Sequence, residues 1–353
     1  MNTAEAIALL EALIAIPSFS REENGTADHI ENYLKGLGIS TERLQNNVWA
    51  KNARYNEAKP TLLLNSHHDT VKATGDWKAS PHEAVTEGEK LTGLGSNDAG
   101  ASLVSLMSVF ISHYDKELPF NLIYAASAEE EISGKQGMEL LREHLGPIAL
   151  AIVGEPTQME LAVAEKGLMV VDCISKGKAG HAAREEGINA IYKAMKDIDW
   201  IEAHQFPKVS EHLGEVNMAV TIINAGKQHN VVPAECHFTI DVRSTDQYSN
   251  EEVLKTLKDE LSSEVNARST RLNPSGIDKE HPICRLAQKL DLNTYGSPTL
   301  SDQALMPWPS VKIGPGDSAR SHTANEYILH SEIDQGIEIY TNIIKELTHE
   351  TLG

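Results

Sequence analysis

The stretch TLLLNSHHD at residues 61–69 gives the clearest signal of the fold, because a short apolar run passes directly into residue types that can bind metals. Its leucines have polar flanks and the length of a buried strand. Three further segments repeat this pattern: LIYAASAEEE at 122–131, LAIVGEPT at 150–157 and VKIGPGDSARSH at 311–322. In an open α/β sheet, ligands bind at the carboxyl ends of strands. We therefore expect these four strand ends to converge on one crevice.

Helical spacing alternates with these strands, which predicts βαβ units and a covered, mainly parallel sheet. Helices are expected at 4–15, 26–36, 99–113, 135–144, 282–290 and 331–348. The pattern changes after Gly167, where strands at 168–174, 217–223 and 236–242 alternate with helices near 188–198 and 250–261. That order is typical of a small α+β sandwich. We therefore predict an α/β catalytic domain formed by residues 1–166 and 278–353, with a second domain inserted at 167–277.

Composition narrows the classes of function. The 353 residues are 41% hydrophobic and 23% charged, which is typical of a globular enzyme of two domains. The net charge of −20 opposes binding to phosphate backbones and anionic lipid, so we expect neither a nucleic-acid nor a membrane partner. Three separated cysteines without a CxxC motif indicate a reducing compartment. The first 16 residues carry Glu5 and Glu11 and no basic residue, as in an amphipathic helix rather than a signal peptide, so we expect a cytoplasmic protein.

Side chains at the strand ends are candidates for metal chemistry. In the HxD pair, His67 could bind a metal while Asp69 orients it, although a lone HxD is more often structural. GLGSND at 93–98 is a poor dinucleotide loop, but it could form a turn that aims Asp98 at two metals. In the triplet at 129–131, one glutamate could be a ligand and its neighbour a general base; the alternative is a solvated loop.

The remaining candidates are weaker when each is taken alone. Glu155 precedes a proline, and a simple turn explains it equally well, whereas His322 gains interest from its position after a strand. In the expected inserted domain, His181 lies among small residues that leave room for another surface. Asn230 precedes a strand that ends in Arg243, and a guanidinium can grip a carboxylate with two parallel hydrogen bonds. Packing or a surface salt bridge is the alternative for each.

Taken together, seven motifs in order resemble the zinc-dependent amidohydrolase family of acetylornithine deacetylase, succinyl-diaminopimelate desuccinylase, aminoacylase and carboxypeptidase G. They are SHHD, GLGSND, EEE, GEPT, GHAA, NVVP with DVR, and GPGDSARSH, and they span nearly the whole chain. GEPT and SHTANE look most like the acetylornithine or acetyl-lysine deacetylase branch. The resemblance implies a zinc-peptidase-like three-layer catalytic domain with a mixed sheet and an inserted ferredoxin-like dimerisation domain.

The resemblance also implies a role for each matching residue. His67 and Glu155 would hold one Zn²⁺, Glu131 and His322 a second, and Asp98 would bridge them. Glu130 would be the general base, with Glu129 and Glu130 as the less favoured pair in the triplet. Asp69 would support His67. His181 would reach the active site of the partner subunit in a homodimer, and Asn230 with Arg243 would hold the α-carboxylate of the substrate. Co²⁺ or Mn²⁺ could replace Zn²⁺.

Three positions depart from the family pattern, and the first is Ser66, which replaces the usual glycine before the first histidine. Gly100 stands where the family often has lysine, and His68 is an extra imidazole that strand alternation should point away from the metals. The implied reaction is hydrolysis of an N-acyl amino acid, as by acetylornithine deacetylase in arginine biosynthesis. N-acyl-citrulline, N-acetyl-lysine or N-succinyl substrates are alternatives, as is a dipeptidase or aminopeptidase on the same frame. A dehydrogenase or a silent metal-binding scaffold is less favoured.

Overall fold

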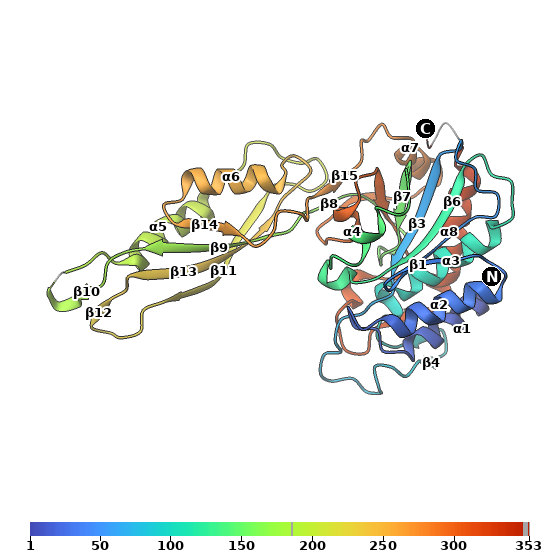
Figure 1. Cartoon of the computed structure of the whole chain (residues 1–353), viewed down its shortest axis with the longest axis horizontal. Helices are drawn as coiled ribbons and strands as arrows, with labels where there is room; N and C mark the ends of the chain where they lie inside the picture. Colours follow the sequence, from blue (N-terminus) through green and yellow to red (C-terminus); the bar gives the residue numbers. More distant parts are fainter. Residues whose placement is uncertain (185, 349–351, 353) are drawn as a thin grey trace. The chain divides into compact units, whose positions relative to one another are not determined.

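The computed structural model describes residues 1–184, 186–348 and 352, which fall into two compact units (Figure 1). Unit 1 comprises Met1–Val163, Ile277–Tyr295 and Ser301–Gly353. Unit 2 comprises Ala164–Gly276 and the short segment Gly296–Leu300. Unit 1 is therefore discontinuous in sequence, and unit 2 is inserted into it.

A nine-stranded mixed sheet, whose strands other than β15 lie wholly or partly in unit 1, has the order β1-β2-β6-β3-β7-β17-β8-β15, with β16 also pairing with β8. Its strands are β1 (Glu42–Leu44), β2 (Asn47–Lys51), β3 (Thr61–His67), β6 (Asn121–Ser127), β7 (Leu150–Val153), β8 (Leu161–Glu165), β15 (Ser275–Gly276), β16 (Thr294–Ser297) and β17 (Ser310–Lys312).

The four strands predicted from the metal-binding motifs lie together and run parallel, as β6-β3-β7-β17. Every residue of these four strands is buried, which explains their continuous apolar runs. The outer pairings, such as β1 with β2 and β8 with β15, are antiparallel. Because the central strands share one direction, their carboxyl ends meet at one edge of the sheet.

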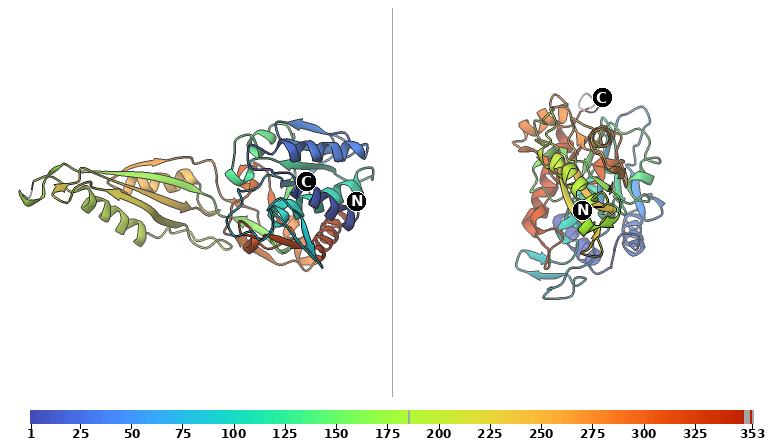
Figure 2. Two further views of the ribbon diagram at one scale, coloured as in Figure 1. Left: turned by 90° about the horizontal axis from the view of Figure 1, so that it is seen from below. Right: turned by 90° about the vertical axis from the view of Figure 1, so that its left-hand side faces the viewer.

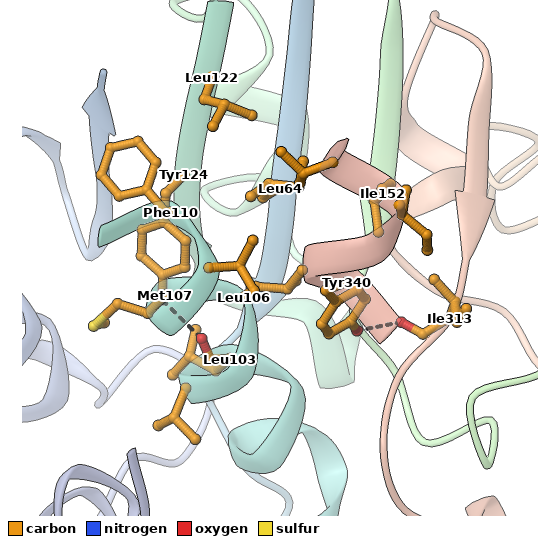
Figure 3. Packing of buried hydrophobic residues seen from close by; sticks show 14 of the residues in the cluster. Leu64, Leu103, Leu106, Met107, Phe110, Leu122, Tyr124, Ile152, Ile313 and Tyr340 are labelled. Carbon is orange, nitrogen blue, oxygen red and sulfur yellow. Dashed lines mark hydrogen bonds between the residues drawn. The ribbon is translucent and has the colours of Figure 1, made fainter. Parts of the chain in front are cut away.

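Helices of unit 1 pack on this sheet and on one another (Figure 1). They are α1 (Thr3–Ile14), α2 (Asn24–Gly36), α3 (Ala101–His113), α4 (Met138–Leu141), α7 (Pro282–Lys289) and α8 (His330–Glu346). Helix α3 contacts α1, α8, β3 and β6, and most of its side chains are buried. Figure 3 shows the resulting core, in which the Tyr340 hydroxyl donates to the backbone oxygen of Ile313 at 2.6 Å. This core fixes the strands whose ends carry the candidate site.

Short elements complete unit 1 near the candidate site. β4 (Val85–Glu87), β5 (Lys90–Thr92) and β18 (Tyr327–Leu329) form a three-stranded antiparallel sheet. Single helical turns lie at η1 (Ser96–Gly100), η2 (Glu130–Ile132), η4 (Asp302–Leu305) and η5 (Ser318–Arg320). The long helix predicted at 135–144 is wrong, because only α4 forms there. Gly137 has non-helical backbone angles, and a Cβ on it would lie 1.9 Å from the Ala128 oxygen.

Unit 2 has the ferredoxin-like order of strands and helices. β9 (Met169–Lys176), α5 (Ala190–Ala203), β11 (Asn217–Ala225), β13 (Glu235–Arg243), α6 (Asn250–Glu260) and β14 (Glu264–Ala267) follow in sequence. The sheet order is β11-β13-β9-β14 with antiparallel neighbours, and in Figure 2 α5 runs along this sheet. A separate ribbon pairs β10 (Gly180–His181) with β12 (Val231–Val232); η3 is Ala182–Arg184. The predicted α/β class with an inserted α+β unit is confirmed. Within the described ranges, every helix is too short or too polar to cross a lipid bilayer.

Candidate metal centre

Six side chains from five segments of unit 1 come together near the carboxyl ends of the parallel strands. His67 ends β3, Glu155 follows β7, and Asp98 lies in η1 before α3. The others are Glu130 and Glu131, which follow β6, and His322, which follows η5. Ligand atoms of His67, Asp98 and Glu131 lie within 4.8 Å of one another, as do those of His67, Glu130 and Glu155. The crevice expected from the strand ends is therefore a cluster of imidazoles and carboxylates.

The Asp98 carboxylate lies between two imidazoles. Its Oδ1 is 3.2 Å from Nε2 of His67, and its Oδ2 is 3.6 Å from Nε2 of His322. His322 Nε2 is also 2.9 Å from Oε2 of Glu131, while His67 Nε2 is 3.7 Å from Oε1 of Glu155. The Asp98 carboxylate therefore lies between two groups of possible ligands. One of its oxygens faces His67, which is near Glu155, and the other faces His322, which is near Glu131.

The backbone at residues 129–131 determines which glutamates face the cluster. Glu129 has a positive φ of 55°, and its side chain lies against Gly134 and the amide of Gln136, away from the cluster. The carboxylate of Glu130 points to His67, with a distance of 3.9 Å between Oε2 and Nε2, and that of Glu131 points to His322. The geometry therefore favours Glu130 and Glu131 over the alternative pair.

Asp69 is buried and forms hydrogen bonds with several groups besides His67. Its backbone oxygen is 3.0 Å from Nδ1 of His67, so this nitrogen carries the proton and Nε2 faces the cluster. Its carboxylate is 3.5 Å from the same Nδ1 and accepts hydrogen bonds from the amides of Glu130 (3.0 Å) and Glu131 (3.2 Å) and the hydroxyl of Ser20 (2.7 Å). One carboxylate thus orients donors from two strands.

His68 points away from the cluster, as strand alternation requires. Its ring nitrogens lie 2.8 Å from the Thr26 hydroxyl and 2.8 Å from the backbone oxygen of Asn46. Burial lowers the pKa of His68 to about 4, so it is neutral near pH 7. It is a buried structural histidine.

The cluster holds more negative charge than its imidazoles neutralise. Burial and then the neighbouring Asp98 raise the pKa of Glu155 to about 8, against the opposing effect of His67. Burial raises the pKa of Glu130 well above its usual range, and nearby carboxylates add to this. His322 has its pKa raised to about 9 by its hydrogen bond to Glu131. Glu155 Oε1 is also buried without a hydrogen-bond partner. Divalent cations would satisfy this oxygen and offset the charge, so the donor set fits them.

Sequence reasoning assigned no role to two further buried carboxylates near the cluster. Asp302 in η4 accepts hydrogen bonds from Asn65 (3.0 Å) and Ser127 (2.6 Å), and burial raises its pKa to about 6. Glu326 accepts three backbone amides of the loop that carries Asp98. Glu326 lies within the SHTANE motif, which could have drawn attention to it, whereas no local pattern marks Asp302.

The loop before α3 has no room for a side chain at Gly100. A Cβ there would lie 2.4 Å from the backbone oxygen of Gly95 and 2.6 Å from Leu10. This close backbone approach explains why a lysine does not fit the present conformation.

The other three candidate residues lie in unit 2, at two different ends. His181 and Asn230 are exposed neighbours on the β10–β12 ribbon, where the Ala182 amide donates to the Asn230 oxygen at 3.1 Å. Arg243 ends β13 and forms two hydrogen bonds with Asp241, at 2.8 and 3.2 Å. The nine residues of β13 separate the two ends by about 26 Å.

Comparison with known proteins gives a consistent picture. Residues 163–268 match a family model described as a peptidase dimerisation domain. The chain is 26% identical to a [LysW]-lysine/[LysW]-ornithine hydrolase of Sulfurisphaera tokodaii, over 96% of this chain and 94% of the relative. It is 25% identical to a succinyl-diaminopimelate desuccinylase of Dinoroseobacter shibae, over 97% and 99% of the two chains.

Solved structures share the fold. Aminopeptidase PepT from Bacillus cereus superposes with a TM-score of 0.78 at 20% identity, over 98% of this chain and 99% of that one. A dinuclear metal-binding peptidase of the M20 family from Bacillus subtilis superposes with a TM-score of 0.73 at 15% identity, over 99% and 98%. Both resemblances extend over both units.

Proposed function

Since the chain belongs to the M20 peptidase family and is a metal-dependent amidohydrolase, we propose that it hydrolyses N-acyl amino acids with two divalent cations. The observation that carries this proposal is the position of Asp98, whose two oxygens face His67 and His322 separately. His67 and Glu155 would hold one cation, Glu131 and His322 the other, and Asp98 both. Zinc suits this mixture of imidazole and carboxylate donors. The dinuclear peptidase of B. subtilis supports a count of two.

Bound cations would polarise the acyl carbonyl and lower the pKa of a water molecule. Glu130 has the position and environment of a base that later acts as an acid. Its carboxylate lies beside the cluster, and its burial favours the protonated form. Glu130 takes the proton of the attacking water and then donates it to the amide nitrogen. The C–N bond breaks, and a carboxylate and an amine leave.

N-acetylornithine is the first substrate we propose, which would give the chain a place in arginine biosynthesis. The desuccinylase relative favours an N-succinyl amino acid as the second candidate, and the Sulfurisphaera relative favours a lysine or ornithine product. These substrates share an α-carboxylate for which Arg243 has the required chemistry, once it exchanges its present partner Asp241.

We further propose that unit 2 forms a homodimer. β11 is the edge strand of its sheet and exposes Ile222 and Ile223. Within one copy, His181 and Asn230 lie near the start of β13 and Arg243 at its end, and this strand alone spans about 26 Å, which is too far for the three to hold one small substrate together. Two copies solve this problem, because His181 of the partner subunit could meet a substrate held by the first subunit's Arg243.

The experiment uses the full chain, treated with a chelator and reloaded with Zn²⁺. Metal analysis should give two zinc ions per chain. Release of free amine would then be measured from the N-acetyl derivatives of ornithine, lysine and citrulline, from N-succinyl-ornithine and from dipeptides. Two bound zinc ions without hydrolysis of any acylated amino acid would exclude the proposed deacylase. Faster hydrolysis of dipeptides would favour the peptidase alternative.

A further inference from the structure

Glu326 lies outside the proposed ligand set, yet its carboxylate is among the most strongly hydrogen-bonded in unit 1. It is 2% exposed and sits between His322 and β18. Its Oε1 accepts the amides of Asn97 at 2.8 Å and Asp98 at 2.9 Å, and its Oε2 accepts the amide of Gly95 at 3.1 Å. All three donors belong to the loop that presents Asp98.

These three amides need an acceptor from elsewhere in the chain. They lie in the turn before α3, and each of them donates to the Glu326 carboxylate, which comes from a distant segment. Gly95 has a φ of +76°, and Asp98 itself has non-helical angles, so the loop forms a concave group of amides. Because the site is buried, water is a poor substitute for the carboxylate. The conformation of the Asp98 loop therefore depends on Glu326.

The backbone of Glu326 is held independently of its side chain. Its oxygen accepts the amide of Gly93 at 3.0 Å, and the next residue, Tyr327, begins the pairing of β18 with β5. The carboxylate therefore projects from a fixed strand end rather than from a free loop. A fixed acceptor can impose a position on the segment that it binds.

Asn97 links the loop that carries Asp98 to the loop that carries His322. Its side chain donates to the backbone oxygen of Asp317 at 3.0 Å and accepts the amide of Asp317 at 3.0 Å. Asp317 begins the turn that leads to His322. A Cβ at Gly316 would lie 2.3 Å from Oδ1 of Asn97, so the two loops meet at close range. The loops that carry Asp98 and His322 are thus joined in both directions.

The joined loops matter because His322 is poorly supported by its own surroundings. Its side chain is 56% exposed, and its φ of 59° lies in the left-handed region. Its distance to Asp98 is therefore set by the loops that carry the two residues.

The structure assigns Glu326 as a positioning residue that holds the Asp98 carboxylate between His67 and His322 and so sets the affinity for the shared cations. This inference rests on the proposed metal-dependent hydrolysis. A glutamine at this position keeps the size but has one acceptor oxygen, and its amide group would face the Gly95 amide. An aspartate keeps both acceptor oxygens but is one methylene too short to reach all three amides.

The test compares wild type, Glu326→Gln and Glu326→Asp as full chains. Zn²⁺ affinity is measured by competition with a chromophoric chelator, and the Co²⁺-loaded proteins are compared by visible absorption. We expect the more weakly bound Zn²⁺ to lose roughly 10- to 100-fold in affinity in Glu326→Gln. The kcat should fall while KM changes little, and excess Zn²⁺ should restore part of the kcat. Glu326→Asp should show a smaller loss.

Asp197→Asn is the matched control. Asp197 is also a buried carboxylate that accepts backbone amides, those of Ser262 and Ser263, but it belongs to unit 2 and contacts no candidate ligand. The Asp197→Asn substitution should lower the melting temperature without changing the affinity for Zn²⁺. Wild-type Zn²⁺ affinity and Co²⁺ spectra in both Glu326 variants would overturn the assignment and leave the proposed function intact. If Glu326→Gln does not fold, Glu326→Asp alone decides. Failure of the wild type to bind Zn²⁺ would overturn both.

Discussion

Replacing Glu130 with glutamine should raise the stability of the metal-free protein and abolish its activity. Ligand atoms of Glu130 and Glu155 lie within 4.8 Å of each other. At an effective dielectric constant of about 20, two unit charges 4.8 Å apart repel by about 3.5 kcal/mol. Burial raises the pKa of Glu130 and so favours its protonated form, which makes the realised gain smaller than this and lets it increase with pH.

The effect on turnover has the opposite sign. A general base contributes about 10²- to 10⁴-fold to the rate, and glutamine cannot accept the proton of water. Because Glu130 is not a ligand in the proposed site, both cations should still bind. The variant should therefore combine normal metal content with a kcat lower by about 10²-fold or more.

Urea denaturation in EDTA at pH 8 measures the stability, and amine release by the Zn²⁺-loaded enzyme measures the activity. Glu129→Gln is the matched control, since it is the same substitution on a neighbour whose side chain faces away from the cluster. Its kcat should stay near that of the wild type. A Glu130→Gln enzyme that keeps a tenth of the wild-type kcat with both cations bound would refute the role of Glu130. A large loss in Glu129→Gln would show that the wrong pair was chosen.

Three further predictions concern the cluster and the exposed edge strand of unit 2. In EDTA, the melting temperature should be highest near pH 5 and fall towards pH 9, because the raised pKa values of Glu155 (about 8) and His322 (about 9) give stability that is lost as these groups deprotonate. With Zn²⁺ bound, the melting temperature should depend less on pH. An equal dependence on pH with and without Zn²⁺ would contradict this explanation. Asp69→Asn should lower the free energy of unfolding, measured by urea denaturation, by about 1–3 kcal/mol and should weaken Zn²⁺ binding, since an amide cannot replace both acceptor oxygens. Unchanged Zn²⁺ affinity would argue against a positioning role for Asp69. Ile222→Glu should shift a homodimer towards monomer in light scattering, and an unchanged mass would remove β11 from the proposed interface.

The residue pattern alone was enough to predict the buried parallel strands and the polar residues at their ends. Buried parallel strands are continuous apolar runs, and their carboxyl ends share one edge of the sheet, so runs ending in His67, Glu131 and Glu155 had to bring these residues near one another. The order of elements in unit 2 was readable for a similar reason, since the period of the apolar residues changes after Gly167. The ligand roles themselves remain a prediction.

Which side chains support the cluster could not be predicted from the sequence, because it depends on contacts between distant segments. A left-handed residue at Glu129 turns its two neighbours towards the histidines, and three adjacent glutamates contain no signal for that turn. The partnership of Glu326 with the Asp98 loop joins segments more than 200 residues apart. The spacing of apolar residues indicates which face of a helix or strand is buried. It does not indicate which distant side chain accepts a hydrogen bond from an unpaired amide. That choice depends on the packing of strands and loops against one another, which is a property of the whole fold.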